Sequence, residues 1–590
     1  MFASKKLLTL VMMALAIVAD TQAAPADAKA RGLPDAFMGQ SILSSSRSAP
    51  SNIPSVWKQL GSASTSDAFT FTITLQSDMA GLTSRMQSIA SSDGPWLTED
   101  QLAQYATPSA AAISAVKLFL TINGVPSSAA TWSRYQDSVT VKSTVGTVAR
   151  LFSTSFNNWQ LSGGPIVPRT KAFSIPDTVA PFISDVYPLA TFGQVQSISA
   201  GTVPAEAVNS ETLNRRAAVP SSCSTSLVKP DCLRAYYGQG AYNATGGSGV
   251  DIAVIGMIDQ YFSANDLQVF NYNFQSRATY YNMPVILRNG ATNNSSKPGL
   301  ETMLDTEIVS SQTYPLTSQF IAEGNSQSTG DLFLLTFNDL LSTSFNSTTR
   351  PKVISISYAS DESQFTAAAA QDMCNAAQKL TALGTTIVVA SADRGVASRS
   401  GTCPPFSPSY PSGCPYILSV GATQSFDTEV MANSSLAGFS SSAGSSNIFS
   451  TPSYQSSVVK AYKSSIPSSA ASMYNSSGRF FPDVSAQGSK YAVVLGGSLY
   501  AVSGTSASAP LFASILSLVN DQRRVAGKSP IGWAQPKIYA NATSVGAFTD
   551  ITSGGSYNCN GTANGFPTAA GWDAPSGWGT PTWPKIAQLF

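Results

Sequence analysis

Four short apolar runs, rich in β-branched residues, recur in the second half of the chain and constrain its fold more than any other feature. They are residues 251–255, 353–356, 386–390 and 416–420. Strands that are buried on both faces of a parallel sheet have this continuous apolar character. Helical patterns lie between or after the runs, at 364–383 and 511–522. Alternating strands and helices predict an α/β domain with a doubly wound, mostly parallel sheet.

The first part of the chain predicts a separate α+β domain. Residues 69–75 and 138–141 read as strands, the first with clear alternation, and residues 109–120 read as a helix. Every cysteine lies after residue 220, as does every Asn-x-Ser/Thr site for N-glycosylation. A stretch rich in small polar residues separates the two parts. We therefore expect a leader at 1–23, an activation-type domain at 24–196, a linker at 197–218 and a main domain at 219–590.

The amino terminus predicts secretion. Lys5 and Lys6 precede an apolar run over 7–19, and Thr21-Gln22-Ala23 forms a plausible cleavage site. The run is too short to span a bilayer comfortably, which disfavours the alternative of a membrane anchor. The linker contains Arg215-Arg216, which is either a processing site or an incidental pair of solvated arginines.

The six cysteines also fit an exported protein, because an even number in a secreted chain favours disulfides. Fifteen complete pairings are possible, and Cys223 and Cys232 are near enough in sequence to pair locally. Metal binding by cysteine is disfavoured, since the chain has neither a Cys-x-x-Cys pair nor a histidine.

Charged residues make up only 11% of the chain, and the formal net charge is +1. No basic run or stripe is present, so a nucleic-acid partner is not expected. Few cations would repel one another once the carboxylates protonate, which fits an acid-tolerant protein.

The segment Ser503-Gly504-Thr505-Ser506-Ala507-Ser508-Ala509-Pro510 predicts an exposed serine at the start of a helix. Gly504 permits a tight turn, and Pro510 is tolerated in a first helical turn. Free backbone N–H groups at that helix end can stabilise an oxyanion. The alternative is an ordinary N-cap serine. Because the chain contains no histidine, a carboxylate would have to accept the Ser506 proton, which predicts activity in acid.

The whole segment resembles the serine motif of the subtilisin-like fold, and a histidine-free version resembles the sedolisin family, or serine-carboxyl peptidases. That resemblance implies a Glu-x-x-x-Asp pair on a helix, which Glu301 and Asp305 match. Residues four apart share a helix face, and two close carboxylates tend to share one proton. Asp305 would then orient Glu301, and Glu301 would act as general base. The alternative is a pair of solvated acids on a surface helix.

The resemblance also implies an acid that donates to the oxyanion, and Asp393 in Ser391-Ala392-Asp393-Arg394-Gly395 occupies its position. Ala392 replaces the family glycine. A carboxylic acid donates only while it is protonated, so we expect a bell-shaped pH profile that peaks below neutrality. By the same resemblance, Ser357, Tyr358 and Ala359 lie on the strand that pairs with substrate, with Ala359 in place of a glycine.

A Gly-rich region near the carboxyl terminus predicts a site for one structural Ca²⁺. Its carboxylates and carbonyls suit a cation that prefers oxygen ligands, although an ion-free loop is the alternative. The resemblance implies ligands from two side chains and three backbone carbonyls, which are Asp550, Ile551, Ala569, Gly571 and Asp573. With this resemblance, the relative positions of the cysteines predict the disulfides Cys403–Cys559 and Cys374–Cys414.

The sequence thus predicts a secreted, acid-active serine-carboxyl peptidase made as a proenzyme, releasing tripeptides from free N-termini. An acid endopeptidase of the same family and an inactive peptide-binding relative are the alternatives. The expected partners are peptide or protein substrates and the chain's own propeptide. We expect a monomer and no membrane partner.

Overall fold

The computed structural model describes residues 44–50, 53–161, 164–198, 201–204, 220–223, 226–324, 331–433, 438–559 and 564–590. The predicted leader and the pair Arg215-Arg216 lie outside these residues. The chain forms two compact units. The first contains the described residues up to Met79 and Ala103–Phe192, and the second contains Ala80–Leu102 and Gly193–Phe590. A stretch of the predicted activation-type domain, Ala80–Leu102, is therefore part of the second unit.

The second unit is built on an eight-stranded sheet. Seven of its strands follow the order β13-β14-β12-β15-β17-β19-β20, and β23 also pairs with β19. All pairings are parallel except that of β20 with β19. The bounds are β12 Ile252–Gly256, β13 Val285–Arg288, β14 Ser318–Glu323, β15 Val353–Ile356, β17 Thr386–Ala390, β19 Leu418–Gln424, β20 Val430–Met431 and β23 Val484–Gln487. The four predicted apolar runs form β12, β15, β17 and β19, which confirms the doubly wound, mostly parallel sheet.

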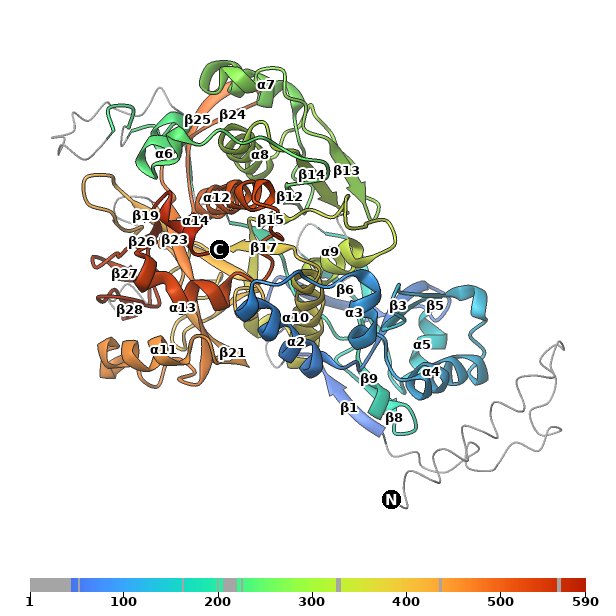
Figure 1. The fold of residues 1–590 in the computed structure, drawn as a ribbon. Helices are drawn as coiled ribbons and strands as arrows, with labels where there is room; N and C mark the ends of the chain where they lie inside the picture. The colour runs from blue at the N-terminus through green and yellow to red at the C-terminus, as the bar shows by residue number, and fades with distance from the viewer. Residues whose placement is uncertain are drawn as a thin grey trace, which may run out of the picture. The chain divides into compact units, whose positions relative to one another are not determined.

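Helices cover both faces of this sheet, which explains why its central strands are buried throughout. The helices α8 (Leu300–Thr313) and α12 (Thr505–Val525) pack side by side on one face, while α9 (Leu332–Leu341) and α10 (Ala367–Ala382) pair on the other (Figure 1). Helix α12 begins earlier than the sequence indicated, so Pro510 lies inside the helix rather than in its first turn. The carboxyl ends of the parallel strands all meet one edge of the sheet, where the site lies.

Shorter elements complete the second unit. Its other helices are α6 Pro230–Tyr236, α7 Ala264–Phe274, α11 Ser456–Tyr462, α13 Gln535–Val545 and α14 Lys585–Gln588. Its other strands are β10 Gln196–Ser197, β11 Gly201–Pro204, β16 Tyr358–Asp361, β18 Ser409–Tyr410, β21 Gly444–Ser450, β22 Gly478–Phe481, β24 Tyr491–Leu495, β25 Ser498–Ser503, β26 Phe548–Thr549, β27 Gly555–Ser556, β28 Phe566–Pro567 and β29 Thr580–Pro581.

The first unit is α+β, as the sequence predicted. Its sheets have the strand orders β4-β5-β3-β9, β2-β6-β7 and β1-β8. Their bounds are β1 Ser44–Ser48, β2 Trp57–Ser62, β3 Ala68–Leu75, β4 Ala130–Trp132, β5 Ser138–Thr144, β6 Asn157–Leu161, β7 Ile166–Arg169, β8 Ala172–Pro176 and β9 Ile183–Tyr187. The helices α4 (Ala110–Ile122) and α5 (Val145–Leu151) contribute apolar side chains to the core formed with β3 and β5.

Two helices connect to both units along the chain, α2 (Met79–Ser92) and α3 (Glu99–Ala106). Within the second unit, Trp96 donates from its indole N–H to the carbonyl of Pro530 at 2.9 Å. Asp93 forms ion pairs with Arg523 (2.9 Å), Lys528 (3.4 Å) and Lys537. Arg350 pairs with Glu99 at 2.6 Å.

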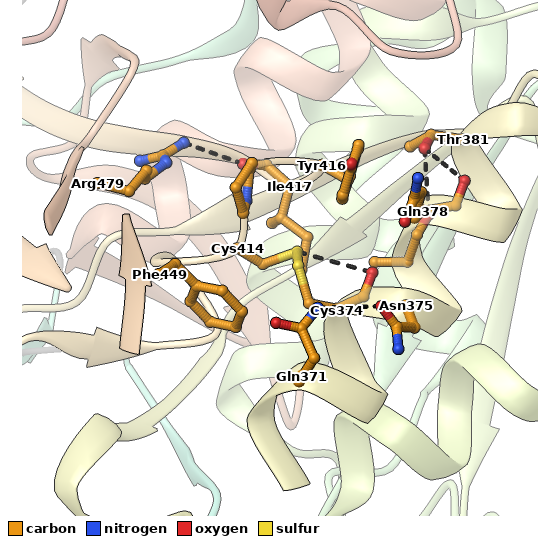
Figure 2. Close-up of a disulfide and its surroundings, with 12 residues drawn as sticks. Gln371, Cys374, Asn375, Gln378, Thr381, Cys414, Tyr416, Ile417, Phe449 and Arg479 are labelled. Carbon is orange, nitrogen blue, oxygen red and sulfur yellow. Dashed lines mark hydrogen bonds between the residues drawn. A yellow bond between two sulfur atoms is a disulfide. The ribbon is translucent and has the colours of Figure 1, made fainter. Parts of the chain in front are cut away.

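Three disulfides connect the cysteines as Cys223–Cys232, Cys374–Cys414 and Cys403–Cys559. This confirms the predicted pairings. Figure 2 shows Cys374, on α10, bonded to Cys414 in the segment that leads into β19. The third disulfide connects the loop after β17 with the region close to the predicted calcium ligands.

Over the described residues, no single helix has the length and apolarity to span a membrane. One bent pair, Glu99–Ala106 with Ala110–Ile122, meets these criteria by length and composition alone.

Candidate active site

The predicted site residues come from two neighbouring strands and two neighbouring helices. Ser357 follows β15, and Asp393 follows β17. These strands pair in parallel, so their carboxyl ends lie next to each other. Glu301 and Asp305 occupy the first turns of α8, and Ser506 occupies the first turn of α12. Because α8 and α12 pack together, the fold brings these elements to one place.

Ser506 lies in the first helical turn after Gly504, as the sequence predicted, but it is buried rather than exposed. Its Oγ has no hydrogen-bond partner among the described residues. A buried hydroxyl without a partner is costly, and such groups usually have a chemical role or meet a ligand. The arrangement therefore fits a nucleophile and disfavours the N-cap alternative, because Gly504 is the N-cap residue and the Ser506 hydroxyl caps no N–H group.

Ser357 connects the acid pair to Ser506. Its hydroxyl is within hydrogen-bond distance of Asp305 Oδ1 (2.9 Å) and of the Ser506 backbone carbonyl (3.3 Å). In a regular helix, the backbone N–H of the residue four positions later would donate a hydrogen bond to that carbonyl. Here that residue is Pro510, which has no N–H, so the carbonyl of Ser506 remains available to Ser357. The hydroxyl of Ser357 thus faces α8 and α12, and its predicted contact with substrate stays a prediction.

The acid pair is buried: Glu301 and Asp305 are each 1% exposed. Burial and the charge of Glu301 raise the pKa of Asp305 well above its usual range, although the bond from Ser357 opposes this. This raised pKa of Asp305 fits a pair that shares one proton, which stays a prediction. The solvated surface pair considered as an alternative does not fit this burial.

Asp393 lies at the start of α12 and contacts Thr505, the residue before Ser506. Its Oδ1 accepts the backbone N–H of Thr505 at 2.8 Å and the Thr505 hydroxyl at 2.9 Å. Its Oδ2 is buried and has no partner among the described residues. Burial raises the pKa of Asp393 to about 8, against the lowering effect of both Thr505 bonds. Below that pH, Oδ2–H is a donor with no partner, next to Ser506.

Ala392 shows the structural consequence of replacing a glycine. Its φ is 93°, a left-handed backbone conformation that residues with a Cβ rarely adopt. The Ala392 N–H donates to Thr505 Oγ1 at 3.2 Å, and its carbonyl accepts from Ser442 N–H at 2.7 Å. These bonds hold the turn in place despite a conformational cost of about 1–3 kcal/mol.

A segment of the chain itself lies along the predicted substrate strand. Within the second unit, Gln196 pairs with Ala359 and Ser197 with Tyr358, in antiparallel register. The N–H of Ile198 then donates to Glu301 Oε2 at 3.1 Å. This placement could not be predicted from the sequence, because a two-residue strand in a polar segment carries no periodic signal.

The predicted calcium ligands lie in one loop region. Asp550 Oδ2 accepts the N–H of Gly571 at 2.8 Å, and Asp573 Oδ2 accepts the N–H of Ala569 at 2.8 Å. Burial raises the pKa of Asp573 to about 7, and the charge of Asp550 adds to this rise. Two mutually repelling carboxylates around one short loop suit a cation with oxygen ligands. No group of three or more His, Cys, Asp or Glu able to hold a metal occurs within the described parts of the chain.

Comparisons with known proteins were made for the sequence and for the fold. Residues 55–192 match the family model "Pro-kumamolisin, activation domain", and residues 330–525 match "Subtilase family". A Pseudomonas sedolisin (serine-carboxyl proteinase), solved with two molecules of pseudo-iodotyrostatin, aligns with a TM-score of 0.49 at 19% identity. That alignment covers 62% of this chain and 98% of the sedolisin.

Two relatives show the family to which the chain belongs. The tripeptidyl-peptidase sed4 of Aspergillus fumigatus is 33% identical over 87% of this chain and 88% of its own length. The tripeptidyl-peptidase SED2 of Arthroderma otae is 30% identical over 67% of each chain. The chain thus carries an activation domain followed by a subtilase-family domain; it is a serine-type peptidase and belongs to the sedolisin family of serine-carboxyl peptidases.

Proposed function

We propose that the chain is a secreted, acid-active peptidase that releases tripeptides from free N-termini. Ser506 is the nucleophile, Glu301 the general base, Asp305 the residue that orients Glu301, and Asp393 the oxyanion donor. The observation that carries this assignment is the convergence of three buried residues, Ser506, Glu301 and Asp305, with the half-buried Asp393. Of these, Ser506 Oγ, Asp305 Oδ2 and Asp393 Oδ2 have no hydrogen-bond partner among the described residues.

In the proposed reaction, Ser506 Oγ attacks the substrate carbonyl carbon while Glu301 accepts the hydroxyl proton. Asp393 donates its proton in a hydrogen bond to the oxygen that becomes negative. When the C–N bond breaks, Glu301 returns its proton to the leaving nitrogen. Water then attacks the acyl carbon while Glu301 accepts its proton; the C–Oγ bond breaks, Glu301 returns the proton to Ser506 Oγ, and the product leaves.

The acid optimum follows from two opposite ionisation requirements. Glu301 must be ionised to accept a proton, whereas Asp393 must be neutral to donate one. Since Asp393 has a pKa raised by burial to about 8, its protonated form persists throughout the acid range. The rate should therefore rise as Glu301 ionises and fall as Asp393 loses its proton.

Tripeptide release is inferred from the relatives, which are named tripeptidyl-peptidases. An acid endopeptidase is the second candidate. The observation that favours it is the path of residues 193–198, which enter the substrate strand as a continuous chain rather than as a free N-terminus. Secretion is supported by the three disulfides.

The calcium site would be formed by the side chains of Asp550 and Asp573 and by the carbonyls of Ile551, Ala569 and Gly571. A bound Ca²⁺ would neutralise the two carboxylates and connect 550–551 with 569–573. We expect a strong chelator to lower the melting temperature of the mature protein. The Asp573→Asn variant should melt lower and respond less to chelator; identical melting of the parent protein with and without chelator would count against the site.

The test of the function is product analysis across pH. An unblocked hexapeptide and its N-acylated copy are incubated with the mature protein between pH 3 and pH 8, and the products are identified by mass spectrometry. We expect tripeptides from the unblocked peptide alone, and we expect the rate of their release to be highest below pH 7. Equal cleavage of both would identify the endopeptidase instead. Ser506→Ala should abolish hydrolysis; no hydrolysis by the parent protein would identify an inactive peptide-binding relative.

A further inference from the structure

Arg399 contacts the chain segment that lies on the substrate strand. Its Nε donates to Gln196 Oε1 at 2.6 Å, and its Nη2 donates to the carbonyl of Ser197 at 3.2 Å. Its Nη1 donates to the carbonyl of Ala359, on the strand itself, at 3.3 Å. The guanidinium thus reaches a side chain, the backbone of the same segment and the strand with which that segment pairs.

The loop that carries Arg399 is held in place by its surroundings. The backbone N–H of Arg399 donates to Asp361 Oδ1 at 3.1 Å and to Oδ2 at 3.2 Å. Asp361 ends β16 and is 9% exposed. Cys403, four residues after Arg399, is bonded to Cys559. The backbone that carries the guanidinium is therefore fixed. Binding a ligand then costs less conformational entropy, because the loop is already ordered.

Antiparallel pairing determines which part of a ligand meets Arg399. A peptide that pairs with β16 in the register of β10 places one residue opposite Ala359 and the next opposite Tyr358. The Nη2 contact is with a backbone carbonyl, which every peptide supplies. The Nε contact is with a side chain, so it distinguishes one peptide from another.

We propose that Arg399 is a specificity-determining residue that selects an acidic or amide side chain at the substrate position opposite Ala359. A guanidinium binds a carboxylate through short, charge-assisted bonds and binds an amide oxygen less strongly. It repels an ammonium group at the same place. The favoured substrates are thus peptides with Glu, Gln or Asp at this position, and lysine there is disfavoured. This inference rests on the proposed function, because it assumes that substrates occupy the strand now occupied by Gln196 and Ser197.

The test uses peptides with Glu, Gln or Lys at each of the three positions before the cleaved bond, assayed at pH 5 with the mature enzyme. At one position we expect kcat/KM to be about ten-fold or more higher for Glu than for Lys. Arg399→Gln should reduce that ratio to within about two-fold, mainly through KM. Arg394→Gln, a matched change at an exposed arginine of the same loop, should leave the ratio unchanged. Equal ratios in the parent enzyme and Arg399→Gln would overturn the inference.

A second measurement needs no variant. The Glu and Gln peptides differ in charge only while the substrate carboxyl is ionised, above about pH 4.3. Glu should therefore be favoured over Gln at pH 5.5, and the two should converge near pH 3.5. A Glu/Gln ratio that does not change with pH would contradict the inference. If no peptide in the set is cleaved at any pH, the proposed function itself has failed, which separates the two outcomes.

Discussion

At the scale of single residues, the protonation state of Asp393 is expected to set the alkaline limit of the proposed reaction. Its Oδ1 already accepts two bonds from Thr505, so only Oδ2 remains to donate. Asparagine can reproduce both roles, since its oxygen accepts and its NH₂ donates at every pH. We therefore expect Asp393→Asn to retain measurable activity and to lose the alkaline decline associated with a pKa of about 8.

The matched variant is Asp393→Ala, which removes the donor altogether. Its kcat should fall by about a hundred-fold or more, as for loss of an oxyanion donor elsewhere. The measurement is kcat/KM from pH 3 to pH 9 for both variants and the parent enzyme. An unchanged alkaline limb in Asp393→Asn would show that another group titrates there.

At the scale of elements, α12 and β15 are coupled through Ser357, because Pro510 leaves the Ser506 carbonyl without its helical partner. We expect Ser357→Ala to lower kcat about ten-fold or more with little change in KM, since Asp305 Oδ1 loses its donor while the β16 pairing is retained. Thermal melting of the variant serves as control. A change confined to KM would instead support the original prediction that Ser357 contacts substrate.

The same elements show what the sequence could and could not reveal. Residues 386–390 were predicted as a strand with the bounds that β17 has, because a buried parallel strand needs only a short β-branched run. The start of α12 was missed, since Thr505-Ser506-Ala507 has no apolar periodicity and the proline suggested a later start. Arg399 was also missed. Its role depends on long-range pairing between Gln196 and Ala359, which no local pattern encodes.

At the scale of the whole molecule, buried carboxyl groups connect the fold's stability to acid pH. Burial raises the pKa of Asp331 to about 6 and of Glu323 and Glu362 to about 7. Unfolded carboxyl groups titrate near pH 4. Between about pH 4 and pH 7 the folded chain therefore holds more protons than the unfolded chain. Linkage then requires that stability is fully present below pH 4 and is lost as pH rises through 6 and 7.

Glu323 provides the test of this coupling, because it lies outside the proposed active site and its Oε2 accepts from Asn289 at 2.7 Å. Glu323→Gln keeps that acceptor and removes the ionisation. In full-length protein carrying Ser506→Ala to prevent self-digestion, the urea midpoint should fall from pH 5 to pH 7. Glu323→Gln should make that decline shallower, by at most about 1.4 kcal/mol per pH unit for one proton. Asp100→Asn, at an exposed carboxylate of α3, should leave the decline unchanged. If the protein were instead most stable at pH 7, burial of these carboxyl groups would not govern its pH dependence.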